Sequence, residues 1–266
     1  MLQLRKAEKK QSKIRIALMG VSGGGKTYSS LVLAKGLAGS LNNVAIIDTE
    51  RSSADLYADL GDYLVLPIDP PYSPEKYIQA IQICESAGVN VIIIDSISHE
   101  WEAEGGILAT HSSMMGNSFA NWNKLTPRHN RFISAILQSK CHIVATIRTK
   151  QDYVLNERNG KIVPEKVGLK GIAREGTDYE FTIVFDINMK HYCTATKDRT
   201  GLFADKPEFL ITEETGQKIK SWCLEEMQIP KPAEDNIPVI SRTSANTTVF
   251  RNQITSQSPR ENGTKS

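Results

Sequence analysis

The stretch Gly20-Val21-Ser22-Gly23-Gly24-Gly25-Lys26-Thr27 decides the fold, because it matches G-x-x-x-x-G-K-[ST], the pattern of a phosphate-binding loop. Residues 14–19 before it are mostly apolar and β-rich, and residues 27–38 after it carry apolar side chains at helical spacing. In this strand–turn–helix context, backbone N–H groups surround a phosphate and the helix dipole favours its charge. Lys26 is expected to reach the β- and γ-phosphates and Thr27 to bind Mg²⁺ through its hydroxyl. The sequence therefore predicts a nucleoside triphosphate site.

Length and composition predict one large domain with a smaller remainder. A chain of 266 residues with 40% hydrophobic residues can bury one sizeable core. The net charge of +2 is too small to indicate nucleic acid or an anionic membrane by itself. No apolar run approaches 18 residues and the basic N-terminus lacks an apolar stretch, so we expect no membrane helix, no secretory signal and a cytoplasmic location. Cys84, Cys141 and Cys193 lie in apolar segments and are expected to be reduced core residues.

Short apolar runs alternate with helical patterns, which is typical of an α/β fold with a mainly parallel sheet flanked by helices. A continuous apolar run such as residues 91–94 suits a strand buried on both faces. The last two runs leave no room for a helix between them and therefore predict an antiparallel edge pair. The runs lie at 14–19, 44–47, 63–66, 91–94, 142–147, 181–187 and 192–196, and the helical patterns at 27–38, 52–60, 74–88, 127–139 and 213–226.

The chain is expected to contain a basic N-terminal arm at 1–13, one α/β domain at 14–227 and a disordered tail at 228–266, where Ser, Thr, Asn and Pro predominate. Residues 100–126 and 151–170 show no clear periodicity and are expected to be long functional or mobile loops. The second loop is locally basic and could follow DNA phosphates, but a solvated mobile loop fits equally well. Its basic residues are Lys150, Arg158, Lys161, Lys166 and Lys170.

Two carboxylates follow buried strands and are candidates for the chemistry of the site. Asp95 comes directly after residues 91–94, at the strand end where α/β sheets bind ligands, and could hold Mg²⁺ through water. Glu50 follows the run at 44–47 and could act on the attacking water as a general base. The residues alone equally allow Glu50 to be a polar side chain at a strand end.

The histidines and tryptophans near residues 99–129 allow two readings each. His99, His111 and His129 do not have the spacing of metal ligands, so polar core or loop histidines are favoured, although His99 could position water or Mg²⁺. Trp101 and Trp122 bracket the first long loop and are expected to anchor it by packing, with base stacking as the alternative.

The order of these motifs resembles the core of RecA-type ATPases. A strand with its phosphate loop is followed by a strand ending in Ile47-Asp48-Thr49-Glu50 and by one ending in Asp95-Ser96. The resemblance implies a RecA-like P-loop fold, ATP and Mg²⁺ as ligands, ATP hydrolysis, and Glu50 as the catalytic carboxylate. It also implies that the strand ending near Thr146 and Arg148 carries the residue that senses the γ-phosphate. RecA has glutamine there, so either residue is a candidate.

Residues 194–203 resemble the RecA and RadA strand that carries two basic residues for the neighbouring subunit's ATP. The resemblance implies that Lys197 and Arg199 act in trans, as an arginine finger does, on charge developing at the phosphoryl group. Side chains two apart on a strand point the same way, which this role requires. A solvated basic hairpin is the alternative. The implied partner is a second copy of the chain, in a ring or filament with ATP between subunits.

More closely, residues 14–223 resemble a family of phage and prophage P-loop ATPases with an AAA domain, some of whose relatives are single-strand annealing recombinases. The resemblance implies an ATPase that acts on single-stranded DNA in recombination, annealing or repair, with a single-strand-binding protein as a further partner. The alternative is an oligomeric, nucleotide-gated ATPase that loads or regulates another protein without binding DNA. The matching stretches include Ile94-Asp95-Ser96-Ile97-Ser98-His99, Thr126-Pro127-Arg128-His129-Asn130-Arg131 and Lys166-Val167-Gly168-Leu169.

Overall fold

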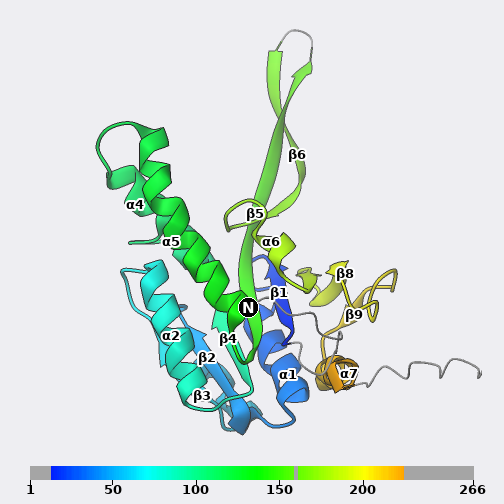
Figure 1. The fold of residues 1–266 in the computed structure, drawn as a ribbon. Coiled ribbons are helices and arrows are strands. Elements are labelled where there is room, and N and C mark those ends of the chain that lie inside the picture. The colour runs from blue at the N-terminus through cyan, green and yellow to red at the C-terminus, as the bar shows by residue number, and fades with distance from the viewer. Residues whose placement is uncertain (1–12, 159–160, 225–266) are drawn as a thin grey trace, which may run out of the picture. The chain divides into compact units, whose positions relative to one another are not determined.

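The computed structural model describes residues 13–158 and 161–224, and the side chains of residues 153–167 lie outside what it describes. Residues 1–12 of the predicted arm and the whole predicted tail at 228–266 are therefore outside the described residues. Within the described ranges the strands follow the order β3-β2-β4-β5-β1-β7-β8-β9, with β6 paired to β5 (Figure 1).

The described strands and helices have the following bounds. The strands are β1 (Arg15–Gly20), β2 (Val44–Asp48), β3 (Leu64–Pro67), β4 (Val91–Asp95), β5 (His142–Arg158), β6 (Lys161–Gly171), β7 (Ile183–Ile187), β8 (Tyr192–Asp198) and β9 (Phe209–Leu210). The helices are α1 (Lys26–Ala38), α2 (Pro74–Ser86), α3 (Ser98–Glu102), α4 (Ile107–Ser113), α5 (Ser118–Gln138), α6 (Thr177–Glu180) and α7 (Glu213–Leu224), with 3-10 turns η2 (Leu41–Asn43) and η3 (Ser53–Leu60).

The sheet is parallel from β3 to β7 and antiparallel beyond it. Strands β1, β2, β3, β4, β5 and β7 pair in parallel, whereas β8 runs antiparallel to β7 and β9 antiparallel to β8. The predicted mainly parallel sheet with an antiparallel edge pair is confirmed, and β9 adds two residues outside that pair. Because the parallel strands share one direction, their carboxyl ends form a common edge, at which the phosphate loop begins.

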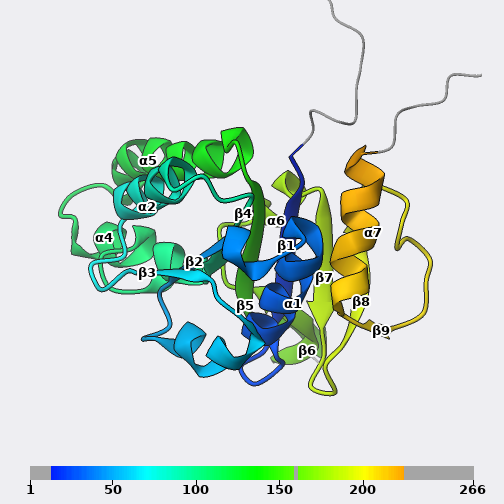
Figure 2. The same cartoon turned by 90° about the horizontal axis from the view of Figure 1, so that it is seen from below.

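The two faces of the sheet carry separate cores, as the alternation of side chains along a strand requires. Ile93 of β4 packs with α1 and α7 on one face, and its neighbour Ile92 packs with α2 and α5 on the other. Figure 2 shows α1 and α7 lying together on one side of the strands and α2 and α5 on the other. The sheet is thereby buried on both faces, which explains why its central strands read as continuous apolar runs.

Helices α1 and α7 approach unusually closely, and glycine permits it. A Cβ atom at Gly36 would lie 1.9 Å from the carbonyl oxygen of Glu213, a distance that no side chain can occupy. The close contact fixes α7 against the helix that follows the phosphate loop. The C-terminal helix of the described chain is therefore part of the scaffold that holds the loop.

Two segments predicted to be loops are instead regular structure. Residues 151–158 and 161–170 form most of an antiparallel pair of strands, in which β5 continues past the sheet and pairs with β6 from Thr149↔Gly171 to Arg158↔Lys161 (Figure 1). Residues 100–126 contain parts of α3 and α5 and all of α4. Helix α5 begins at Ser118 rather than at the predicted 127 and continues through Pro127. Pro127 therefore lies inside the helix and not at its start.

No helix in the described ranges combines the length and apolar character that a membrane crossing requires. All four cysteines are free and buried, which agrees with the core positions predicted for Cys84, Cys141 and Cys193.

Candidate nucleotide-binding and active site

The phosphate loop connects the end of β1 to the start of α1, as predicted. Gly25 caps α1 with φ 86° and ψ 20°, a left-handed conformation that glycine adopts without strain, and among the described residues no side chain caps the first N–H groups of the helix. The first N–H groups of α1 are therefore open to an anion. Lys26 Nζ donates to the carbonyl oxygen of Val21 at 2.9 Å, and burial lowers the pKa of Lys26. A bound phosphate would offer the lysine a charged acceptor in place of a neutral carbonyl.

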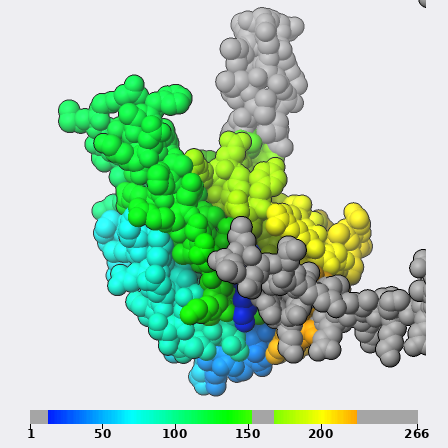
Figure 3. All heavy atoms as spheres, in the orientation of Figure 1, coloured from blue at the N-terminus to red at the C-terminus, as the bar shows by residue number. Residues whose placement is uncertain are grey.

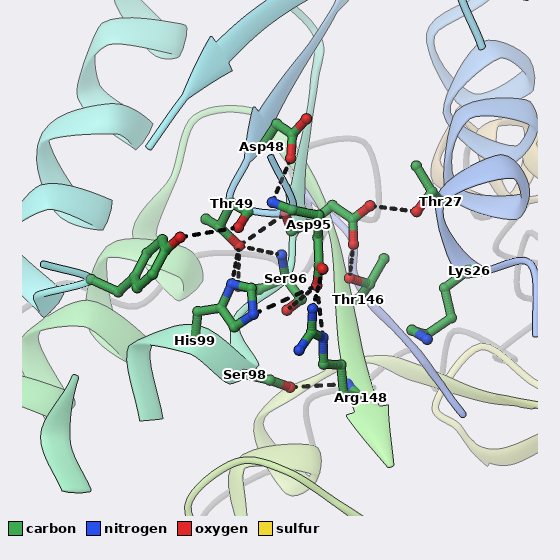
Figure 4. A network of polar contacts seen from close by, with 12 residues as sticks. Lys26, Thr27, Asp48, Thr49, Asp95, Ser96, Ser98, His99, Thr146 and Arg148 are labelled. Carbon is green, nitrogen blue, oxygen red and sulfur yellow. Dashed lines mark hydrogen bonds and ion pairs between the residues drawn. The ribbon is translucent and has the colours of Figure 1, made fainter. Parts of the chain in front are cut away.

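Asp95 lies at the carboxyl end of β4, where two hydroxyl groups hold it. Thr27 Oγ1 donates to Asp95 Oδ2 at 2.6 Å, and Thr146 Oγ1 on β5 donates to Asp95 Oδ1 (Figure 4). Asp95 is 2% exposed, and burial raises the pKa of its carboxyl more than the two hydrogen bonds lower it. A hydroxyl and a carboxylate are oxygen ligands that suit Mg²⁺, which needs few protein ligands when phosphate and water complete its shell. The residues present therefore fit this ion.

Glu50 follows β2 in a turn that Asp48 holds in place. The backbone N–H of Glu50 donates to Asp48 Oδ1 at 2.6 Å, and that of Ala54 donates to Asp48 Oδ2 at 3.1 Å. Both carboxylate oxygens of Asp48 are thus occupied by the backbone of the turn. Asp48 accordingly positions Glu50 rather than facing the nucleotide itself.

The carboxylate of Glu50 is paired with Arg148, near the point where β5 leaves the sheet. Arg148 Nε donates to Glu50 Oε1 at 2.8 Å, and Nη2 donates to Oε2; Ser96 Oγ donates to Oε1 at 3.1 Å. Burial alone would raise the pKa of Glu50, but the hydrogen bonds and charge of Arg148 outweigh it, so the pKa is lowered. The Glu50 carboxyl is therefore ionised at neutral pH, and the positive charge of Arg148 balances its negative charge.

His99 lies on the other side of Glu50. Its Nδ1 is 2.8 Å from Thr49 Oγ1 (Figure 4). Its Nε2 is 3.9 Å from Glu50 Oε1. Burial lowers the pKa of His99, which favours the neutral imidazole. Its ring also packs on Tyr72 with centroids 4.9 Å apart. The structure thus brings His99 to the candidate base and away from the pair formed by Thr27 and Asp95.

One cavity of about 550 Å³ brings the predicted phosphate, metal and water-activating residues together. It is lined by Ser22, Gly23, Gly25, Lys26, Thr27, Tyr28, Glu50, Ser53, Tyr57, Asp95, Arg148 and His191. A second cavity of about 470 Å³ adjoins Glu50 and Arg148 on the side of Tyr72 and His99. Glu50 and Arg148 line both cavities.

Lys197 and Arg199 lie near the amino ends of the parallel strands, whereas the phosphate loop lies at their carboxyl ends. In the sheet register Gly20 is level with Ile187 at the end of β7, whereas Lys197 pairs with Val184 near its start. Lys197 Nζ and Arg199 Nη2 both donate to the carbonyl oxygen of Tyr179, the latter at 3.2 Å. The two cations share a direction, as expected, and neither lines the cavity of its own chain.

The other histidines and the tryptophans pack against one another. Trp101 and Trp122 stack with centroids 6.0 Å apart, and His111 stacks on Trp122 at 4.3 Å. His129 Nδ1 lies 3.1 Å from the buried carboxylate of Glu100. Within the described residues no cluster of three or more histidine, cysteine or acidic side chains could hold a metal ion. The packing role predicted for the tryptophans is confirmed.

Two cavity residues, Tyr57 and His191, had no signal in the sequence. Tyr28 and Tyr57 have ring centroids 6.0 Å apart at the cavity, and His191 reaches it from the β7–β8 turn. The two tyrosines give the cavity an aromatic surface suited to a nucleotide base. An isolated histidine in a turn, or a tyrosine on a 3-10 segment, matches no motif, so only the folded chain reveals them.

Comparisons with known proteins identify a family and similar solved structures. The sequence profile of a family described as AAA domain matches residues 12–212, from before β1 to beyond β9. A search of curated protein sequences finds no match. Among solved structures, the chain is similar to a KaiC-like protein from the hyperthermophilic archaeon Pyrococcus horikoshii OT3. That similarity has 15% identity and a TM-score of 0.43, and it covers 75% of this chain and 86% of the other.

Proposed function

The chain belongs to the AAA domain family, and from this premise we propose that it is a Mg²⁺-dependent ATPase of RecA type. The observation that carries the proposal is the single cavity that joins Lys26, Asp95 and Glu50. These three residues come from the loop after β1 and from the ends of β4 and β2. A site that only bound nucleotide would not need the second carboxylate beside the phosphate position.

Each of the cavity residues has a separate role in the proposed hydrolysis of ATP. Loop N–H groups and Lys26 hold the phosphates, and Thr27 and Asp95 supply oxygens for Mg²⁺, which would withdraw charge from the phosphoryl oxygens. Glu50 takes a proton from water as the water oxygen bonds to the γ-phosphorus and the bond to the β-phosphate oxygen breaks. For this role Glu50 must first leave Arg148. The γ-phosphate offers Arg148 an alternative anionic partner, so Arg148 rather than the buried Thr146 fits the sensor role.

ATP turnover by the full chain tests the proposal directly. Lys26→Ala should abolish turnover and weaken ATP binding, and removal of Mg²⁺ with a chelator should stop wild-type turnover. Lys35→Ala is a matched control, because Lys35 lies on the same helix but pairs with Glu213 at 3.1 Å, away from the cavity. Unchanged turnover in Lys26→Ala would refute the ATPase assignment.

We further propose that active sites are shared between copies of the chain. The support is the placement of Lys197 and Arg199 near the amino ends of the parallel strands, where they cannot serve their own phosphate loop. Mixing inactive Arg199→Ala subunits with inactive Lys26→Ala subunits should restore part of the activity, because some interfaces then pair an intact loop with an intact arginine. Additive loss without recovery would contradict sharing.

Single-stranded DNA is the proposed ligand of the strand pair β5–β6. Lys150 and Lys170 are both exposed and pair directly across the β5–β6 ladder, so their side chains lie on one face of this strand pair. The predicted contacts of Arg158, Lys161 and Lys166 fall on side chains outside the described residues. DNA should stimulate ATP turnover and bind with affinity that falls as salt rises, and Lys150→Ala/Lys170→Ala should reduce both effects.

A protein partner is the second candidate ligand, favoured by a different surface. Met115 is 95% exposed and Phe119 is 86% exposed at the turn between α4 and α5, which projects from the domain (Figure 3). Exposed large apolar side chains at a projecting turn are suited to a protein contact. If DNA neither binds at low salt nor stimulates turnover, the recombination assignment fails and the loader or regulatory assignment is supported.

A further inference from the structure

We infer that His191 is a positioning residue of the phosphate loop, which sets the orientation of the peptide between Gly24 and Gly25. This inference rests on the proposed nucleotide site and adds to it a residue from the opposite end of the domain's sequence. The observation behind it is a hydrogen bond: His191 Nδ1 lies 3.1 Å from the carbonyl oxygen of Gly24. A carbonyl oxygen can only accept, so Nδ1 carries the proton and donates it.

The turn between β7 and β8 is built to place this ring. Asn188 Oδ1 accepts from the N–H groups of Lys190 at 2.9 Å and Tyr192 at 3.2 Å. His191 itself has φ 67°, a left-handed conformation that few residues other than glycine adopt. An unfavourable backbone conformation that persists in a well-bonded turn indicates that the side chain it orients has a role.

The turn lies beside the loop for a reason of topology. Strand β7 pairs with β1 in parallel, and Ile187, its last residue, is level with Gly20 where the loop begins. The residues after Ile187 therefore pass along one side of the loop. The packing is close, because a Cβ atom at Gly25 would lie 3.0 Å from His191 Nδ1.

The geometry of the peptide bond turns this contact into a function. In a trans peptide the carbonyl group and the following N–H point in opposite directions. His191 draws the carbonyl of Gly24 to one side of the loop, so the N–H of Gly25 points to the other. Gly25 lines the nucleotide cavity, so an N–H of Gly25 that points away from His191 is available as one of the donors that surround a phosphate. If the peptide flipped, a carbonyl oxygen would face the phosphate instead and repel it.

Substitutions at residue 191 separate the donor from the rest of the ring. His191→Ala removes the donor and should raise Kd for ATP and KM about tenfold while kcat stays within about twofold, as expected when binding is lost equally in ground and transition states. His191→Asn should restore wild-type KM to within about twofold, because its amide Nδ2 replaces Nδ1 and asparagine tolerates positive φ. Met189→Ala is the control, since Met189 is exposed on the same turn.

The outcomes distinguish this inference from the nucleotide site itself. His191→Gly fits φ 67° without strain and lacks the donor, so it should bind ATP as weakly as His191→Ala and serves if the alanine variant does not fold. Wild-type ATP binding in His191→Gly, with binding lost in Lys26→Ala, would overturn the role of His191 and leave the site intact. Equal weakening in His191→Asn and His191→Ala would also overturn it. Wild-type binding in Lys26→Ala would refute the nucleotide site.

Discussion

Two carboxylates stand side by side at the edge of the sheet, and their surroundings are opposite. Asp95, at the end of β4, is almost fully buried and is held by the neutral hydroxyls of Thr27 and Thr146. Glu50, just after β2, is half-buried and is held by the cation of Arg148. Burial raises the pKa of the first, and the arginine lowers the pKa of the second. Asp95 therefore lacks a positive charge that a metal can supply, whereas Glu50 has one that must move.

Replacing Glu50, the carboxylate that is paired with Arg148, should have the largest effect on turnover. Glu50→Gln keeps the shape and the nucleotide contacts but cannot take a proton, so kcat should fall by about 10²–10⁴-fold while ATP binding persists. Glu75→Gln is a matched control, because Glu75 makes a similar two-bond pair with Arg128 on the surface, at 2.9 and 2.7 Å. Wild-type turnover in Glu50→Gln would remove Glu50 from the reaction.

Replacing Asp95, the carboxylate that two hydroxyl groups hold, should instead change the Mg²⁺ requirement of turnover. Asp95→Asn keeps the hydrogen bond from Thr27 but removes the charge, so the Mg²⁺ concentration for half-maximal turnover should rise by about 10–100-fold. Titration of turnover with Mg²⁺ measures this shift. A loss of kcat at saturating Mg²⁺ with no change in the metal requirement would contradict the assignment and make the two carboxylates alike.

Removing the cation should make Glu50 behave more like Asp95. Without Arg148 the pKa of Glu50 should rise, because burial then acts unopposed, and the acidic limb of the rate profile should move to higher pH. The pH dependence of kcat/KM in Arg148→Ala tests this. Arg128→Ala, which breaks the surface pair at a cost of about 1 kcal/mol or less, should leave the profile unchanged.

The stability of the protein without metal should show the smallest and most diagnostic difference. Because the pKa of Asp95 is raised in the folded protein, its stabilising contribution is fully present below pH 3.8, the pKa of an unperturbed Asp. That contribution is lost as the pH rises through the pKa of Asp95 in the folded protein. The lowered pKa of Glu50 contributes above 4.5, and that contribution is lost as pH falls through the folded value.

At neutral pH Asp95→Asn should therefore raise Tm and Glu50→Gln should lower it, each by a few degrees, of the order expected for about 1 kcal/mol. The Asp95→Asn difference should shrink as pH falls toward 3.8, and the Glu50→Gln difference should shrink only as pH falls below 4.5 toward the lower folded value. Thermal unfolding of both variants across this range provides the measurement. Shifts of the same sign would mean that the two carboxylates do not differ as the structure indicates.

The sequence predicted one side of this comparison better than the other. Asp95 and Thr27 belong to sequence motifs, and a continuous apolar run predicts the buried strand before Asp95. The contact between Asp95 and Thr27 at the carboxyl ends of the strands could therefore be predicted. The pairing of Glu50 with Arg148 joins residues 98 positions apart. It depends on the spatial order of β2, β4 and β5, which no local pattern contains.

The pairing of β5 with β6 was missed although a signal for it existed. Asn159-Gly160 is a strong two-residue turn signal, and it lies between the paired residues Arg158 and Lys161. Pro164, Gly168 and the many charges of this segment are rare in buried strands, so the segment resembles a loop. Those residues are tolerated here because β6 pairs only with β5 among the described strands and has no place inside the sheet.

Glu50 and Arg148 also lie at the boundary between two cavities, because both residues line the nucleotide cavity and the second cavity beside Tyr72 and His99. A rotation of Arg148 that frees Glu50 before hydrolysis would also open the boundary between the two cavities, so that it is open when inorganic phosphate forms. The phosphate would then have an exit through the second cavity. One side-chain movement would thus both start the reaction and provide its product with a separate route out.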